Sequence, residues 1–150
     1  MSDSRKSPSV TFSIGYNDYQ LDVASSEQNR IGLDTSGLDF GFLMKYPTTF
    51  TRAWLLSSEI LPRLNVSERA TGVSASSGDN PSAYAVKIGF GQEFMLDKDY
   101  QVFWELTERY DKAVYMGTAN TVDPTTGETP SGVDVSTSTT TLSIGFTWGG

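Results

Sequence analysis

Cysteine and histidine are both absent from the chain. The lack of cysteine excludes disulfide scaffolds, thiolate chemistry and cysteine-ligated metals. The lack of histidine excludes Ser-His-Asp triads, histidine general bases and the commonest transition-metal ligand. No other catalytic constellation stands out, so we expect a protein that is not an enzyme and that binds no metal or cofactor.

Long apolar runs and positive charge are also scarce. No stretch approaches the ~20 apolar residues of a membrane-spanning helix. No signal peptide is visible either, because no apolar stretch follows the charges at the N-terminus. This leaves open a cytosolic protein or a mature chain given a new initiator Met. The net charge of −7 argues against a nucleic-acid partner. With 12% aromatic and 19% charged residues, the chain is expected to fold as one domain, residues 1–150, with a flexible N-terminal segment, residues 1–8.

What the chain does contain is a period of two, typical of β strands. Val10, Phe12, Ile14 and Tyr16 alternate with small polar residues. Similar alternation predicts six strands, near residues 9–17, 37–46, 53–60, 84–96, 100–109 and 141–148, the third interrupted at Pro62.

The predicted connections alternate in length. Residues 47–49 and 97–99 form short turns, whereas residues 24–30, 68–82 and 118–138 form long polar loops. Short turns at one end and long loops at the other are typical of outer-membrane β-barrels. We therefore predict an all-β fold, an antiparallel up-and-down transmembrane β-barrel with six readable strands and eight expected in a closed monomer.

The residues between the apolar ones suggest an interior surface. Glycines occupy several of these positions, where a solvated strand would carry larger polar residues. Charges of both signs accompany them and would have to pair inside a narrow barrel. The alternative is an ordinary solvated face, and strict parity places Arg52 on the apolar side. The predicted lumen charge network is Asp39, Lys45, Glu59, Lys87, Glu93, Glu105 and Arg109.

Aromatic residues lie near the ends of the apolar stretches, as in the girdles at membrane–water interfaces. Each stretch covers about nine residues, close to the 9–11 of a tilted membrane strand. The predicted girdle is Tyr16, Tyr46, Tyr100, Trp104 and Trp148.

Residues 83–110, including Ala-Tyr-Ala-Val-Lys-Ile-Gly-Phe-Gly-Gln-Glu-Phe, resemble the penultimate hairpin of small outer-membrane barrels related to opacity proteins and the OmpA barrel. The ending Thr-Leu-Ser-Ile-Gly-Phe-Thr-Trp resembles their closing strand, although Gly149 and Gly150 follow Trp148. This resemblance implies eight strands. Two more strands would lie near residues 30–38 and 61–67, or the chain would supply six strands to a shared barrel.

The leading hypothesis is a non-enzymatic barrel of the bacterial outer membrane that stabilises the envelope or displays its loops for adhesion or interaction. The partners expected are the lipid bilayer and, through loops 24–30, 68–82 and 118–138, a surface ligand or a second copy. Two alternatives stay open: a soluble up-and-down barrel that binds a lipid or other apolar ligand, and a subunit of an oligomeric pore.

Overall fold

A computed structural model describes residues 7–22, 32–69, 81–119, 122 and 125–148. This part of the chain is built of strands, and it contains no helix long and apolar enough to cross a membrane. The strands are β1 (Ser9–Leu21), β2 (Gly32–Pro47), β3 (Arg52–Leu61), β4 (Asn65–Arg69), β5 (Ser82–Met95), β6 (Tyr100–Val114) and β7 (Asp134–Trp148).

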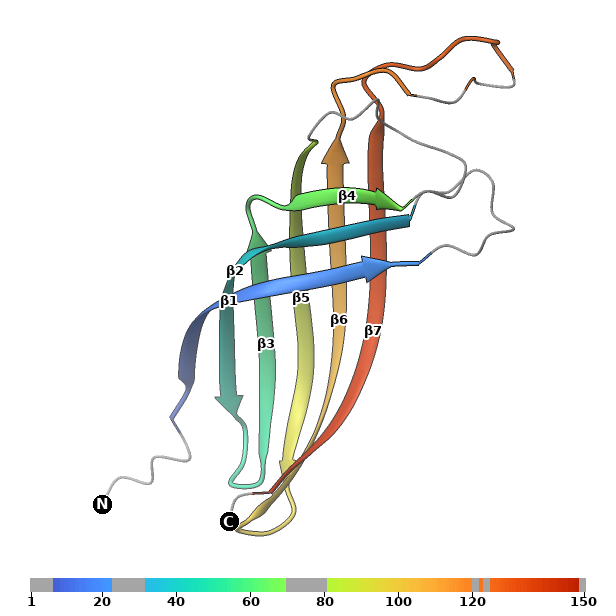
Figure 1. Cartoon of the computed structure of the whole chain (residues 1–150). Helices are drawn as coiled ribbons and strands as arrows, with labels where there is room; N and C mark the ends of the chain where they lie inside the picture. The colour runs from blue at the N-terminus through green and yellow to red at the C-terminus, as the bar shows by residue number, and fades with distance from the viewer. Residues whose placement is uncertain (1–6, 23–31, 70–80, 120–121, 123–124, 149–150) are drawn as a thin grey trace.

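The strands form one antiparallel sheet in the order β1-β2-β3-β5-β6-β7, with β4 off this path and paired with β2. Apart from β4, each strand lies beside the next one along the chain. The sheet curls into a half-barrel (Figure 1). The turns 48–51 and 96–99 lie at the end of the sheet where β1 begins and β7 ends, and the β6–β7 connection lies at the opposite end (Figure 1). The predicted all-β, up-and-down antiparallel architecture is confirmed.

Several strands are longer than the alternation predicts. Residues 32–38 are the first part of β2 and not a separate strand, whereas the predicted extra strand near 61–67 corresponds in part to β4. The predicted loop 118–138 ends at residue 133, because β7 begins at Asp134. Residues 134–141 lack strong apolar alternation, but threonine favours strands and this segment pairs with β6. Loop 24–30 and residues 70–80 of loop 68–82 lie outside the described residues.

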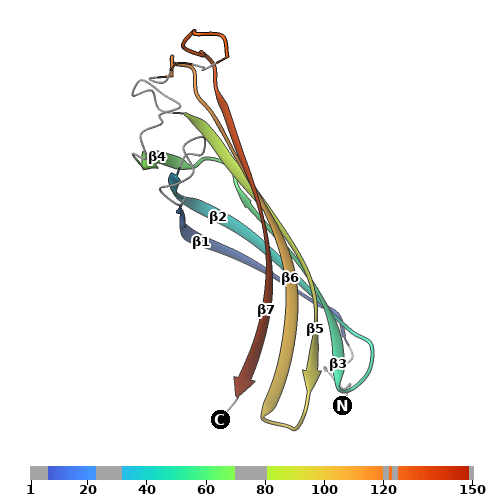
Figure 2. The same ribbon diagram turned by 90° about the vertical axis from the view of Figure 1, so that its right-hand side faces the viewer.

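A break after β3 redirects the sheet. Pro62 follows the last residue of β3 and cannot donate a hydrogen bond to a sheet neighbour. The chain then pairs again with β2 as β4, with Val66 opposite Thr35. Beyond the break, β4 and the adjoining parts of β1 and β2 cross the concave side of β5, β6 and β7 (Figures 1 and 2). A small buried apolar cluster lies at this crossing: Leu61, Leu64, Ala83, Ala85, Ala113 and Tyr115.

The two faces of the sheet differ in an unusual way. Large apolar side chains are highly exposed, including Phe12 (78%), Ile14 (75%) and Ile144 (76%). By contrast, Arg109 and Asp111 are buried. Contacts between β1 and β6 side chains cross the polar face, so this face is the concave one. The apolar face is therefore convex and points outward.

Candidate functional site

The concave face is lined by the residues that alternate with the apolar ones, and small side chains make room for larger ones. Phe103 departs from the pattern by pointing inward. Its ring occupies the space where a side chain at Gly145, its partner in the register, would begin. Only glycine leaves that space free. An aromatic ring therefore fits on the inner face because its neighbour has no Cβ.

Gly89 serves the same purpose for a polar contact. It lies in β5, between Ser57 of β3 and Thr107 of β6. The Ser57 hydroxyl donates to Glu105 Oε1 at 2.5 Å, and both atoms lie where a Cβ on residue 89 would be. Glycine thus lets a hydrogen bond connect two strands across the one between them.

Two ion pairs link strands on this face. Lys87 Nζ of β5 lies 2.8 Å from Glu59 Oε2 of β3, directly opposite in the register. Lys45 of β2 pairs with Glu93 of β5 across the intervening β3. The Lys45–Glu93 pair lines a cavity of about 420 Å³ at the short-turn end of the half-barrel. Both pairs are partly shielded from water, so each charge has a partner where solvation is reduced.

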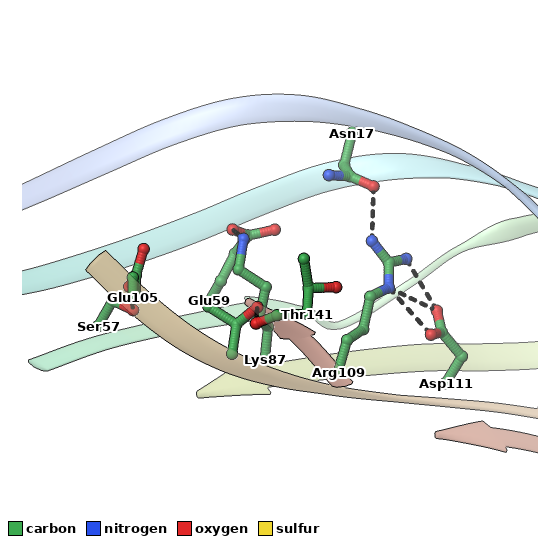
Figure 3. A network of polar contacts seen from close by, with 9 residues as sticks. Asn17, Ser57, Glu59, Lys87, Glu105, Arg109, Asp111 and Thr141 are labelled. Atoms are coloured by element: carbon green, nitrogen blue, oxygen red, sulfur yellow. Dashed lines mark hydrogen bonds and ion pairs between the residues drawn. The ribbon is translucent and has the colours of Figure 1, made fainter. Parts of the chain in front are cut away.

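Arg109 makes the most extensive contacts (Figure 3). Its Nε donates to Asp111 Oδ2 at 2.9 Å, and its Nη2 donates to Asp111 Oδ1 at 2.8 Å. Its Nη1 donates to Asn17 Oδ1 of β1 at 2.8 Å, and its guanidinium lies 4.4 Å from the ring centre of Tyr19. Tyr19 Oη in turn lies 3.3 Å from Thr139 Oγ1 of β7. This cluster spans the concave face from β6 to β1 and β7.

The structure brings together much of the predicted lumen network. Lys45 lies beside Glu93 and Glu59 beside Lys87, whereas Glu105 bonds to Ser57. The carboxylate of Asp39 lies over Gly15 of β1, at 2.9 Å from the position of an added Cβ. Arg109 pairs with Asp111, which the sequence prediction omitted because it ended the fifth strand at residue 109. Continuing the period of two for one more step identifies Asp111.

Negative charge exceeds positive charge on the concave face. Among the described strand residues that point inward, three are cationic and six are anionic: Lys45, Lys87 and Arg109 against Asp39, Glu59, Glu68, Glu93, Glu105 and Asp111. No group of three or more acidic residues in the described part of the chain is arranged to hold a metal ion. The contacts among the described inward residues cross-link strands of the concave face.

The convex face carries an apolar band, which we define as the outward apolar residues between the two ends of the sheet. In β7 the band runs from Leu142 to Trp148, and in β1 it runs from Val10 to Tyr16. Outward residues on the strands between them continue it: Leu38, Phe40, Phe42, Met44, Tyr46, Trp54, Leu56, Ile60, Ile88, Phe90, Val102, Trp104 and Leu106.

The band does not follow the register rows of the sheet. Its centre in β7 is Gly145, whose row passes through Phe103, Glu93, Ala53 and Pro47 and meets β1 near residue 7. The centre of the band in β1 is residue 13. The band therefore climbs about six residues in five strand-to-strand steps. At about 3.3 Å per residue and 4.8 Å per strand, this climb tilts the band by about 40° relative to the register rows.

Aromatic residues gather at the lower edge of this tilted band, the edge nearer the short turns. Four strands contribute to this edge: Tyr46, Trp54, Tyr100 and Trp148. Each of these residues lies within about one residue of the edge position that the climb of the band gives for its strand. Tyr16 reaches the upper edge, and Tyr84 and Tyr110 lie above it. Trp104 lies in the middle of the band, where its ring packs edge-on against that of Phe90 with 6.1 Å between the ring centres. Sequence reasoning missed Trp54, Tyr84 and Tyr110 because the climb is visible only with the register.

No family model, no curated protein and no solved structure matches this chain.

Proposed function

We propose that this half-barrel is a non-enzymatic membrane β-barrel protein of the bacterial outer membrane, with its convex face in lipid and its concave face lining the barrel interior. The tilt of the apolar band supports this most strongly. Strands in β-barrels incline by about 35–45° to the barrel axis. A band that climbs at about 40° across the register becomes level around such a barrel, as a bilayer of constant thickness requires.

The tilt also accounts for outward residues that do not suit lipid. On the tilted band, Arg52 falls just below the lower edge, where its guanidinium lies 5.7 Å from the ring centre of Phe94. Glu108 falls just above the upper edge and accepts hydrogen bonds from Ser138 and Thr140. Gln92 and Ser58 remain within the band as uncharged polar residues. Outward charges thus occupy levels where the side chains reach the polar interface.

The aromatic residues support the same orientation. Tyrosine and tryptophan place an apolar ring in lipid and a polar group at the headgroups. Tyr46, Trp54, Tyr100 and Trp148 form such a row at the short-turn end, with Tyr16, Tyr84 and Tyr110 toward the other. By the usual asymmetry of these barrels, the short turns face the periplasm and the long connections face outward.

The polar interior favours a structural or loop-displaying role. Ion pairs and the Arg109 cluster line much of the concave face, whereas a carrier of lipids would need an interior that is mainly apolar. A barrel whose interior is filled by side chains should also conduct ions poorly. We therefore propose that the protein stabilises the envelope or presents the β6–β7 connection and its neighbouring loops for adhesion or interaction.

Reconstitution tests this proposal directly. The urea-unfolded chain is diluted into vesicles of dilauroylphosphatidylcholine, or into buffer without lipid, and both samples are floated on a sucrose gradient. We expect strand-rich protein to float with the vesicles and the lipid-free sample to aggregate. A stable, monodisperse soluble monomer without lipid or detergent would refute the proposal.

A further inference from the structure

The six-strand path β1-β2-β3-β5-β6-β7 has two open edges. Among the described residues, β1 pairs only with β2, and β7 pairs only with β6. Each edge therefore presents a row of backbone donors and acceptors without strand partners. Within a bilayer such an edge has no water to satisfy it, so spanning sheets close. The inference that follows rests on the proposed membrane function.

The curvature of the sheet limits the number of strands that can close it. Arg109 reaches Asn17, and Tyr19 reaches Thr139, by direct side-chain contacts across the concave face. An interior just wide enough to be filled by side chains is that of a barrel of about eight strands. Six strands alone would enclose too little space for the inward side chains of Phe103, Lys87 and Arg109.

The climb of the apolar band is compatible with the same number. About 1.2 residues per strand sum to about ten around eight strands, an even total that keeps inward residues beside inward residues at closure. The direction of the edges agrees. β7 and β1 run in opposite directions, so an even number of strands must fit between them if every neighbour is antiparallel. Two strands satisfy both requirements.

The charge of the concave face specifies what those strands would carry. Anionic groups outnumber cationic ones on this face, and none of the described residues provides a cation for Asp39. The Asp39 carboxylate lies over Gly15 on the edge strand β1. A lysine or arginine on the inner face of a strand next to β1 would meet it and reduce the excess of negative charge.

We propose that a β-hairpin from outside residues 7–148 fills the gap between β7 and β1, with apolar residues facing outward and at least one lysine or arginine facing inward toward Asp39. A second copy of this chain is a poorer occupant. Pairing β7 with the β1 of another copy gives twelve strands in a ring of two, and the wider interior would separate Arg109 from Asn17.

The gap can be tested with a synthetic hairpin peptide. The peptide has the sequence of residues 82–114 with Glu93→Gln, Glu105→Gln and Asp111→Asn, which supplies two strands of suitable length and leaves Lys87 and Arg109 as the charged residues of the inner face. It is added to the vesicle-inserted full chain, and deuterium exchange of the backbone amides of β1 and β7 is followed. We expect one peptide per chain and slower exchange at both edges. An Asp39→Asn chain, or a peptide with Lys87→Glu and Arg109→Glu, should bind about tenfold more weakly or worse.

Cysteine variants identify the competing occupants, because the chain has no cysteine of its own. An Ile14→Cys, Ile144→Cys chain that forms an internal disulfide would show closure by six strands. A mixture of the two single variants that forms a covalent dimer would show closure by a second copy. Either crosslink overturns the proposal, as do edges that stay unprotected with peptide or binding that ignores the charge changes. Only vesicle-inserted protein is examined, so failure here is distinct from failure to insert.

Discussion

If the apolar band lies in lipid, as proposed, a lysine placed on it should destabilise the protein according to the depth of that residue in the bilayer. Ile144 and Ser136 both point outward from β7, but Ile144 lies next to the centre of the band and Ser136 lies beyond its upper edge. Eight residues at about 3.3 Å each, inclined at about 40°, separate the two levels by about 20 Å. The apolar zone of such barrels is about 25 Å tall, so only residue 144 lies within it.

We therefore expect Ile144→Lys to lower the free energy of unfolding by about 2–4 kcal/mol and Ser136→Lys by about 0–1 kcal/mol. The two variants add the same charge on the same face of the same strand, so Ser136→Lys is the matched control. Urea titration in vesicles, followed by tryptophan fluorescence, measures both.

Equal costs for the two variants would refute the membrane orientation. In water both side chains would face solvent, and a lysine at 144 would remove an exposed apolar group. A soluble protein should tolerate Ile144→Lys at least as well as Ser136→Lys.

Three other predictions concern the interior. Arg109→Met leaves the Asp111 carboxylate buried without its cation and should lower the free energy of unfolding in urea by about 3–5 kcal/mol. Adding Asp111→Asn to this variant should recover part of the lost stability. Unchanged stability of Arg109→Met would contradict the pairing. Gly145→Ala places a methyl group where the Phe103 ring lies and should lower the free energy of unfolding by about 1–3 kcal/mol. The loss should be smaller in a chain that also carries Phe103→Leu, and equal losses in both backgrounds would argue against the contact. Burial, and then the charge of Glu68, raises the pKa of Tyr115. The contribution of the neutral Tyr115 hydroxyl to stability is complete below about pH 10, the ordinary pKa of tyrosine. It is lost as the pH rises from there through the raised pKa of the folded state. Unfolding measured from pH 8 to 11 should show this loss in the parent and not in Tyr115→Phe.

The sequence was sufficient for the features that depend on a single strand. The alternation of Val10, Phe12 and Ile14 with small residues predicts a strand with two unlike faces. Pro62 predicts the end of β3 because it has no backbone N–H to donate. The short turns at 48–51 and 96–99 could be recognised because a hairpin needs only local geometry.

Features that depend on several strands could not be predicted in this way. The partners of Lys45 and Arg109 are set by the register of strands that are distant in sequence, and the register has no local signal. The first residues of β7 could not be predicted because Ser136 and Ser138 give no apolar alternation, although the backbone of this segment is fully paired with β6. The tilt of the apolar band is likewise a property of the assembled sheet.

The buried cluster at the crossing has a consequence for the order of folding. Leu61, Leu64 and Ala85 are buried by the chain itself in a cluster that includes Tyr115. On the proposed function, the outward residues of the band leave water only by entering lipid. Apolar contacts within the chain require no membrane to be favourable. We therefore expect the loop-bearing end to collapse first, while the chain is still in water, and to bring β2, β4 and β5 together. The lipid-facing strands would then extend from an end that is already assembled.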